Sequence, residues 1–196
     1  KSIVKVTYRF PQVDAQWEIT YKVFANGIIK VDNRFVAEGT ETPMIPRVGL
    51  RMQLSEILND LTYYGRGPEE NYRDRRTSQF IGEYTTPIKD LYEPYIRPQE
   101  NEHRTDIYWC ALTTKQKAGL LFIADRTFEL NASNYLLGSL DSGETIDNGA
   151  PRTNETNHRH LTDPQPVKQV DMFIDYRVMG VGGDNSWGAI AHEPYL

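Results

Sequence analysis

The sequence predicts a mostly β protein in which two antiparallel sheets pack face to face. Several segments alternate apolar and polar residues with a period of two, and no segment has a long helical period. The chain also lacks the strand–helix–strand alternation that parallel sheets require. Strands with one apolar face bury it when two antiparallel sheets pack together. We therefore expect residues 1–196 to form a single β-sandwich domain.

The alternation of apolar and polar side chains begins at residues 4–10 and returns at residues 17–23. Asn26-Gly27 follows, a pair that readily adopts positive φ values, and it predicts a two-residue hairpin turn into residues 28–31. The same reasoning predicts further strands at residues 48–54, 106–111, 119–124 and 169–177.

Helical periodicity is weak, and it predicts at most a turn or two of helix at residues 55–61, 74–80 and 132–140. Two long polar segments, residues 66–76 and 141–157, exceed the length of ordinary hairpin loops. Long loops on a rigid β scaffold commonly carry recognition, so we look for function there.

Composition excludes several classes of function. The net charge is −5, and the 22 Lys and Arg residues are dispersed, whereas nucleic-acid binding needs a clustered basic surface. No window approaches the roughly 18 apolar residues of a membrane helix, and the first residues lack the apolar core of a signal peptide. The single Cys110 cannot form an internal disulfide, and its apolar surroundings predict a buried thiol without chemistry.

The first informative motif is Tyr64-Gly-Arg-Gly-Pro-Glu-Glu-Asn-Tyr-Arg-Asp-Arg75, which interleaves arginines with carboxylates. Such charges form bidentate pairs that fix a loop or dock it on another domain. A solvated loop is the alternative interpretation.

The second motif is Met179-Gly-Val-Gly-Gly-Asp-Asn-Ser-Trp187, in which glycines turn the backbone sharply after a strand. From the residues alone, Trp187 is better explained as a half-buried core residue. The alternative is a rim tryptophan on which a pyranose ring lies while Asp184, Asn185 or Ser186 contacts its hydroxyls.

The remaining motifs give weaker indications of function. Neither glycine-rich stretch has the third glycine or the following helix of a dinucleotide site, and the hydrolase and metal-binding signatures are absent. His158-Arg159-His160 could place two imidazoles on one face of an extended segment, but no third zinc ligand is suitably spaced. A structural role for these histidines is therefore favoured over metal binding.

Five motifs, taken in order, resemble the C-terminal domain of bacterial β-galactosidases of glycoside hydrolase family two, which some enzymes carry as a separate small subunit. The motifs are residues 43–50, 67–72, 91–101, 158–161 and 182–187. The resemblance implies a two-sheet supersandwich similar to galactose mutarotases. Because the family domain begins upstream of Lys1 and continues further past Trp187, we expect residues 1–196 to be an incomplete fragment of it.

The resemblance also implies a function: hydrolysis of terminal β-D-galactosides such as lactose by a retaining glycoside hydrolase. In this family the two catalytic carboxylates lie on a barrel domain outside this chain, so the chain alone is expected to be inactive. The resemblance assigns Trp187 to the sugar pocket of that barrel, and Asp184 and Asn185 are further substrate-binding candidates.

The expected partners are the remainder of the β-galactosidase polypeptide or a large subunit, the galactoside, and other copies of the full-length enzyme. No cofactor is expected in this fragment, and any magnesium and sodium would be bound mainly elsewhere. The implied compartment is bacterial, either cytoplasmic or periplasmic.

Two other functions stay open at this point. The chain could be a stand-alone carbohydrate-binding or mutarotase-like protein, in which His158 or His160 and a nearby Glu act as acid and base. It could instead be a purely structural interaction domain, in which case Trp187 is dispensable for the assembled enzyme.

Overall fold

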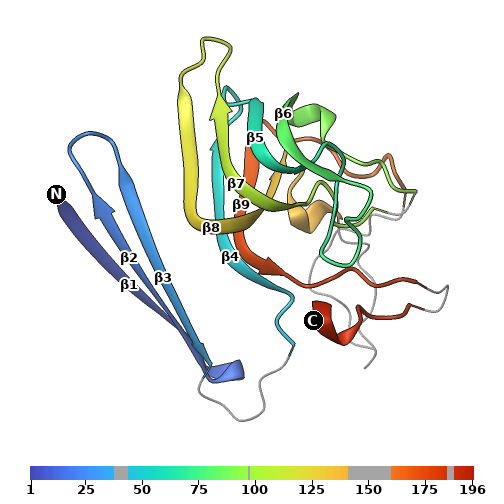
Figure 1. The fold of residues 1–196 in the computed structure, drawn as a ribbon, viewed down its shortest axis with the longest axis horizontal. Coiled ribbons are helices and arrows are strands. Elements are labelled where there is room, and N and C mark those ends of the chain that lie inside the picture. Colours follow the sequence, from blue (N-terminus) through green and yellow to red (C-terminus); the bar gives the residue numbers. More distant parts are fainter. Residues whose placement is uncertain (38–43, 97, 141–159, 185–187) are drawn as a thin grey trace. The chain divides into compact units, whose positions relative to one another are not determined.

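The structure, a computed structural model, describes residues 1–37, 44–96, 98–140, 160–184 and 188–196. The chain divides into two compact units, Lys1–Met44 and Ile45–Leu196, and each contains one antiparallel sheet (Figure 1). The prediction of a mostly β, antiparallel two-sheet fold is confirmed. The expectation of one domain over residues 1–196 stays a prediction.

The first unit is a three-stranded meander of β1 (Ser2–Phe10), β2 (Ala15–Val23) and β3 (Ile29–Ala37), with η1 (Pro11–Val13) between β1 and β2. The pairing places apolar side chains side by side on one face of this sheet: Val4, Tyr8, Trp17, Tyr21, Val31 and Phe35. The other face is charged, and Lys22 Nζ lies 2.8 Å from Asp32 Oδ2 on the neighbouring strand. The period of two in the sequence therefore separates the two faces of this sheet.

The predicted hairpin between β2 and β3 is confirmed, but the prediction of a two-residue turn is wrong. Strand pairing ends at Val23 opposite Ile29, and the Phe24 N–H donates to the Ile28 carbonyl at 2.9 Å. The Gly27 N–H donates to the Phe24 carbonyl at 3.2 Å, and Gly27 has a φ of 87°. The loop between the paired strands is therefore longer than two residues. A type I′ two-residue turn needs positive φ at both central residues, and of Asn26 and Gly27 only Gly27 has it.

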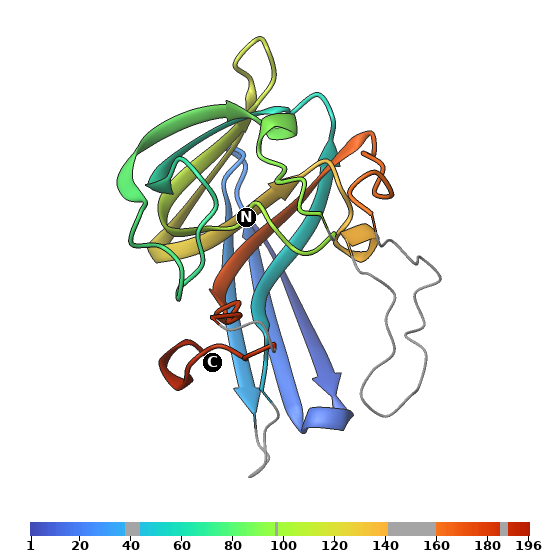
Figure 2. The same ribbon diagram turned by 90° about the vertical axis from the view of Figure 1, so that its right-hand side faces the viewer.

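The second unit contains a six-stranded sheet in the order β4 (Arg47–Ser55), β9 (Gln169–Val178), β8 (Gly119–Ser133), β7 (Arg104–Thr113), β5 (Asp60–Gly67) and β6 (Phe80–Pro87). Its strands twist and curl strongly (Figure 2). The remaining helical segments are η2 (Ile88–Asp90), η3 (Leu137–Leu140) and η4 (Glu193–Tyr195). Over the described ranges, no helix has the length and apolar character needed to cross a membrane.

The expected strands of this unit are present and longer than predicted, whereas the expected helices are mostly wrong. β5 begins inside the segment expected to be helical at residues 55–61, and residues 74–80 form turns that lead into β6. Of residues 132–140, only Leu137–Leu140 is helical. The first two residues of this range belong to β8, which ends at Ser133.

The core of the second unit lies on the apolar face of its sheet. It consists of Leu61, Tyr63, Ile88, Leu91, Ile107, Cys110, Leu112, Phe128, Leu130, Ala132, Val170 and Met172. Alternate residues of β9, Val170 and Met172, belong to this core, while Asp171 and Asp175 lie on the opposite face. Cys110 is buried as predicted, and burial raises the pKa of its thiol.

Truncation of a core leucine should test this assignment. Leu112 is 0% exposed, and we expect Leu112→Ala to lower the free energy of unfolding by about 2–5 kcal/mol, measured by urea denaturation. Leu121, on the paired strand, is 61% exposed, and Leu121→Ala should change it by less than about 0.5 kcal/mol. Equal losses from both variants would contradict the assigned core.

Candidate functional site

The two glycine-rich motifs meet at the side chain of Asp74. Its Oδ1 accepts a hydrogen bond from the Val181 N–H at 3.1 Å, and its Oδ2 accepts one from the Gly182 N–H at 2.8 Å. Residues more than 100 positions apart in the sequence are thereby joined. We call Asp74 together with Gly180, Val181 and Gly182 the Asp74 junction.

A tight turn in the first motif presents Asp74. The backbone of Tyr72 pairs with that of Arg75 through two hydrogen bonds of 3.1 and 2.8 Å, and Asp74 lies between them. Tyr72 is buried at 1% exposure, so the turn is anchored in the protein.

Asn71 anchors the same loop from the inside, with a fully buried side chain. Its amide nitrogen donates to the carbonyls of Arg66 and Glu69 at 3.1 and 3.0 Å. Its amide oxygen accepts from the Thr105 N–H and hydroxyl at 3.0 and 2.6 Å. All four hydrogen bonds fix the loop to itself and to β7, so this asparagine has a structural role.

Glycines on the second motif permit the close approach to Asp74. A Cβ placed on Gly180 would lie 2.5 Å from Asp74 Oδ2 and 2.9 Å from the Ala191 Cβ. Gly182 has a φ of 62°, which L side chains rarely adopt, and a Cβ there would lie 2.4 Å from the Ala189 carbonyl oxygen. The junction therefore requires glycine at both positions.

A buried polar cluster lies behind the junction, and His103 is at its centre. The His103 ring stacks on Tyr72, with centroids 4.9 Å apart and planes inclined by 25°. Its Nδ1 lies 2.7 Å from Asn131 Oδ1, and its Nε2 lies 3.2 Å from Glu129 Oε2. Glu129 Oε2 also accepts from the Val178 N–H at 2.8 Å, at the end of β9. The cluster thus supports both motif segments at once.

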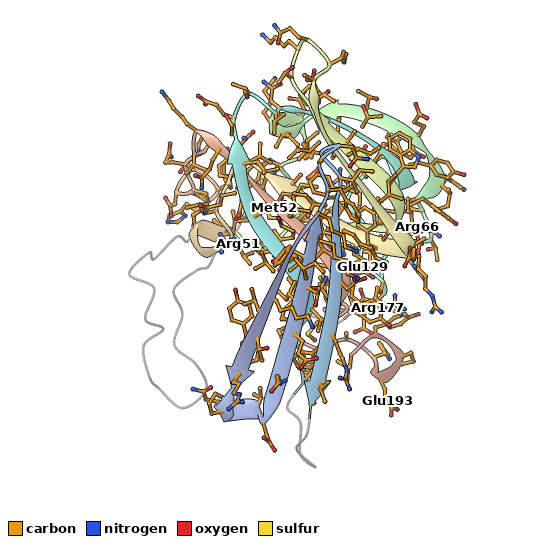
Figure 3. All side chains as sticks on the ribbon, turned by 90° about the vertical axis from the view of Figure 1, so that its left-hand side faces the viewer. Arg51, Met52, Arg66, Glu129, Arg177 and Glu193 are labelled. Atoms are coloured by element: carbon orange, nitrogen blue, oxygen red, sulfur yellow. The ribbon has the colours of Figure 1, made fainter. Side chains whose placement is uncertain are left out.

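The cluster extends across the polar face of β8 and β9. Arg47 donates to Asn131 Oδ1 at 3.0 Å and pairs with Glu100, and its Nε lies 3.2 Å from Asp175 Oδ2. At the open end of the cluster, Arg177 Nη1 lies 3.7 Å from Glu129 Oε1 (Figure 3). These pairs neutralise carboxylates that are buried in the protein interior.

Two carboxyl groups near the cluster have perturbed pKa values. Burial raises the pKa of Glu102 to about 8, although hydrogen bonding by Ser133 opposes the shift. Burial likewise raises the pKa of Asp175 to about 7, against the attraction of the Arg47 guanidinium. Perturbed carboxyl groups mark candidate functional sites, but these two lie inside a packed network.

The charges of the first motif pair partly within the loop and partly with β7. Arg75 Nη2 lies 2.6 Å from Glu70 Oε1, and Tyr95 donates to the same carboxylate. Arg66 and Arg76 both pair with Asp106, at 2.7 and 3.0 Å. The expectation that these charges fix the loop is confirmed, and the solvated-loop alternative is wrong for this part of the motif.

Asp184 is the sequence-predicted site residue whose geometry can be described, and it lies just after the junction. Its Oδ2 is 2.8 Å from His192 Nε2, and both side chains are exposed. The hydrogen bond from His192 lowers the pKa of Asp184, and the same bond raises the pKa of His192. An exposed carboxylate and imidazole can exchange hydrogen bonds with sugar hydroxyls. Asn185 and Trp187 lie outside the described residues.

The described residues offer no site for a metal ion, since no group of three or more His, Cys, Asp or Glu side chains comes together among them. His158 lies outside the described residues, and His160 is exposed, with its N–H donating to Asp163 Oδ2 at 2.9 Å. The structural interpretation of this histidine motif stays a prediction.

Sequence reasoning missed Asp74 and His103 as organising residues. Asp74 belongs to a motif identified in the sequence, and the glycine at position 180 was a signal that some group approaches the backbone there. His103 carries no sequence signal, because its partners come from the first motif and from β8.

Comparison with known proteins decides the family. A family model described as beta galactosidase small chain matches residues 1–196, which is the whole chain. The chain belongs to this beta-galactosidase small-chain family.

Similar proteins include beta-galactosidases of Priestia megaterium, at 31% identity over 193 residues, and of Streptococcus thermophilus, at 30% over 197 residues. A beta-galactosidase of Lactobacillus delbrueckii subsp. bulgaricus is 31% identical over 195 residues. Each similarity covers 98% of this chain but only 17–18% of the relative. The small-chain domain is thus a small part of each of these larger polypeptides.

The stability of the small-chain domain should depend on Asn71, which fixes the loop of the first motif. Asn71→Ala leaves buried donors and acceptors without partners, each costing about 1–3 kcal/mol, so a clear loss in urea denaturation is expected. Gln116, an exposed amide on the β7–β8 hairpin, is the control, and Gln116→Ala should change stability by less than about 0.5 kcal/mol. Similar stability of the two variants would contradict the structural role of Asn71.

The stability of the small-chain domain should fall with rising pH because of Glu102. Its carboxyl group stays protonated in the folded state up to a pKa of about 8 but ionises near 4.5 when unfolded. The contribution of the protonated Glu102 carboxyl to the free energy of unfolding is therefore complete below pH 4.5 and is lost as the pH rises towards 8. Between pH 5 and pH 8, the free energy of unfolding measured by urea denaturation should fall less for Glu102→Gln than for the wild type. Glu93→Gln is the control, because Glu93 is exposed. If the free energy of unfolding changes equally between pH 5 and pH 8 in both variants, Glu102 is not the cause of the pH dependence.

Proposed function

We propose that this chain is the C-terminal or small-subunit domain of a bacterial β-galactosidase, which hydrolyses terminal β-D-galactosides such as lactose. The observation that carries the proposal is the match of the whole chain to the small-chain family, whose similar relatives are named beta-galactosidases. The domain completes the sugar-binding pocket and supports assembly of the enzyme.

In this proposal Trp187 provides a flat apolar surface for the galactose ring, and Asp184 and Asn185 bind its hydroxyls. The geometry of Asp184 supports this assignment. Its exposed side chain follows a backbone segment that Asp74 anchors, and a binding group on an anchored segment loses little freedom when a sugar binds.

Catalysis is assigned to the remainder of the enzyme. A retaining glycosidase needs an acid and a nucleophile carboxylate about 5–5.5 Å apart, and the proposal places both on the barrel domain. Magnesium and sodium used by the complete enzyme would be bound mainly outside this chain. We further propose that the full-length enzyme is a homo-oligomer in the bacterial cytoplasm or periplasm.

A mutarotase-like activity is the weaker candidate. Such an enzyme needs an accessible histidine and glutamate as acid and base. His103 and Glu129 are a histidine and a glutamate in contact, but they are not accessible: their side chains are 0% and 5% exposed, and Tyr72 covers the imidazole face. The pair is a part of the packed interior, which favours the domain role over a stand-alone enzyme.

Complementation of a matching catalytic fragment tests the proposal. We expect the wild-type chain to restore hydrolysis of a chromogenic β-galactoside, and the chain alone to have no activity. Trp187→Ala should raise KM by about tenfold or more, because stacking of a sugar on an aromatic ring is lost. Tyr8→Ala is the control, since Tyr8 is an exposed aromatic residue to which the proposal assigns no contact with the sugar.

The outcomes separate the candidate functions. Equal rescue by the wild-type and Trp187→Ala chains would leave a structural interaction domain. Absence of rescue, together with mutarotation of galactose by the pure chain, would establish the stand-alone alternative instead.

A further inference from the structure

We propose that Asp74 is a positioning residue for galactoside binding, which acts by fixing the backbone of residues 180–184. The inference deepens the proposed function and rests on it, because Asp184, at the end of this segment, is a proposed sugar-binding residue. Asp74 itself is assigned no contact with the sugar.

The geometry of the Asp74 carboxylate supports this role. Its two oxygens accept hydrogen bonds from two consecutive backbone N–H groups, Val181 at 3.1 Å and Gly182 at 2.8 Å. Two contacts from one rigid group fix both the position and the rotation of the peptide unit between them. Hydrogen bonds to an ionised acceptor are also stronger than those between neutral groups.

Two further backbone hydrogen bonds join this segment to other described residues near the C-terminus. The Gly180 N–H donates to the Tyr195 carbonyl at 2.7 Å, and the Gly183 N–H donates to the Ala189 carbonyl at 2.8 Å. These bonds shape the segment internally but do not tie it to the sheet. Asp74 does so, because its turn is anchored by buried Tyr72 and thereby by His103.

The chemistry of residue 74 is tightly constrained. A Cβ on Gly180 would lie 2.5 Å from Asp74 Oδ2, so the backbone approaches the carboxylate without intervening space. An asparagine at position 74 keeps one acceptor but turns an NH2 group towards a backbone N–H. An alanine removes both acceptors. Asp74→Asn should therefore loosen the segment, and Asp74→Ala should loosen it further.

A loosened segment lowers the fraction of molecules that have their binding groups in place. The apparent affinity for a ligand falls by this fraction, while bound substrate reacts as before. Loss of positioning therefore predicts a higher KM at nearly constant kcat. A merely structural role predicts less assembled enzyme, with KM unchanged.

The test uses the assembled enzyme, formed from the catalytic fragment and variants of this chain, with a chromogenic β-galactoside. We expect Asp74→Asn to raise KM several-fold and Asp74→Ala to raise it about tenfold, with kcat within about twofold of the wild type. Asp90→Asn is the matched control, since Asp90 is an exposed carboxylate paired with Lys89 on η2. Unchanged KM in both Asp74 variants, or loss of assembled enzyme alone, would overturn the inference.

The double variant Asp74→Ala/Asp184→Ala distinguishes this inference from the function on which it rests. If Asp74 acts through the segment, its replacement should raise KM little further once the Asp184 side chain is absent. Additive increases would show that Asp74 acts by another route and would overturn the positioning role. If Trp187→Ala raises KM and Asp74→Ala does not, positioning by Asp74 fails and the pocket proposal stands. If Trp187→Ala alone has no effect on KM, the pocket proposal itself fails.

Discussion

The packing of Tyr72 against the buried His103 ring is the contact on which the two motif segments depend. On one side of the imidazole, the stacked Tyr72 fixes the turn that presents Asp74. On the other side, Glu129 bonds both His103 and the end of β9, where the second motif begins. A polar interior of this kind is stable only when its groups find partners, so each residue of the cluster limits what its neighbours can be.

The strands were predictable wherever one face of the sheet is apolar, because alternation then follows directly from burial. β5 and β6 were missed for a physical reason. Gly65 and Gly82 interrupt their alternation, and a Cβ on Gly65 would lie 2.9 Å from the Ile107 Cα, so close strand packing excludes a side chain there. The polar stretch at residues 74–80 resembled a short helix, but its backbone is turned by the anchored Tyr72–Arg75 pair instead.

The candidate site was predictable as a pair of motifs but not as a joined structure. The spacing of glycines and charges identified both segments, and it correctly indicated a loop fixed by ion pairs. The contact between Asp74 and Gly182 spans 108 positions, and no local pattern specifies which carboxylate meets which turn. Likewise, Glu70, Asp74 and Asp106 are equivalent as acidic residues in the sequence, and only the fold gives each a different partner.

β8 changes its neighbours along its length, so that among the described strands one stretch of this interior strand is paired on one side only. Residues 119–123 pair with β7, whereas pairing with β9 is confined to residues 129–133 among the described strands. Over its first half, the side of β8 that faces away from β7 pairs with no other described strand, and Leu121 and Ile123 in this stretch are exposed. Asp125 and Arg126 lie at the end of this stretch and are exposed. Charged side chains on a strand edge disfavour the addition of a foreign strand, so these two residues limit edge-to-edge pairing at any point where the edge is accessible.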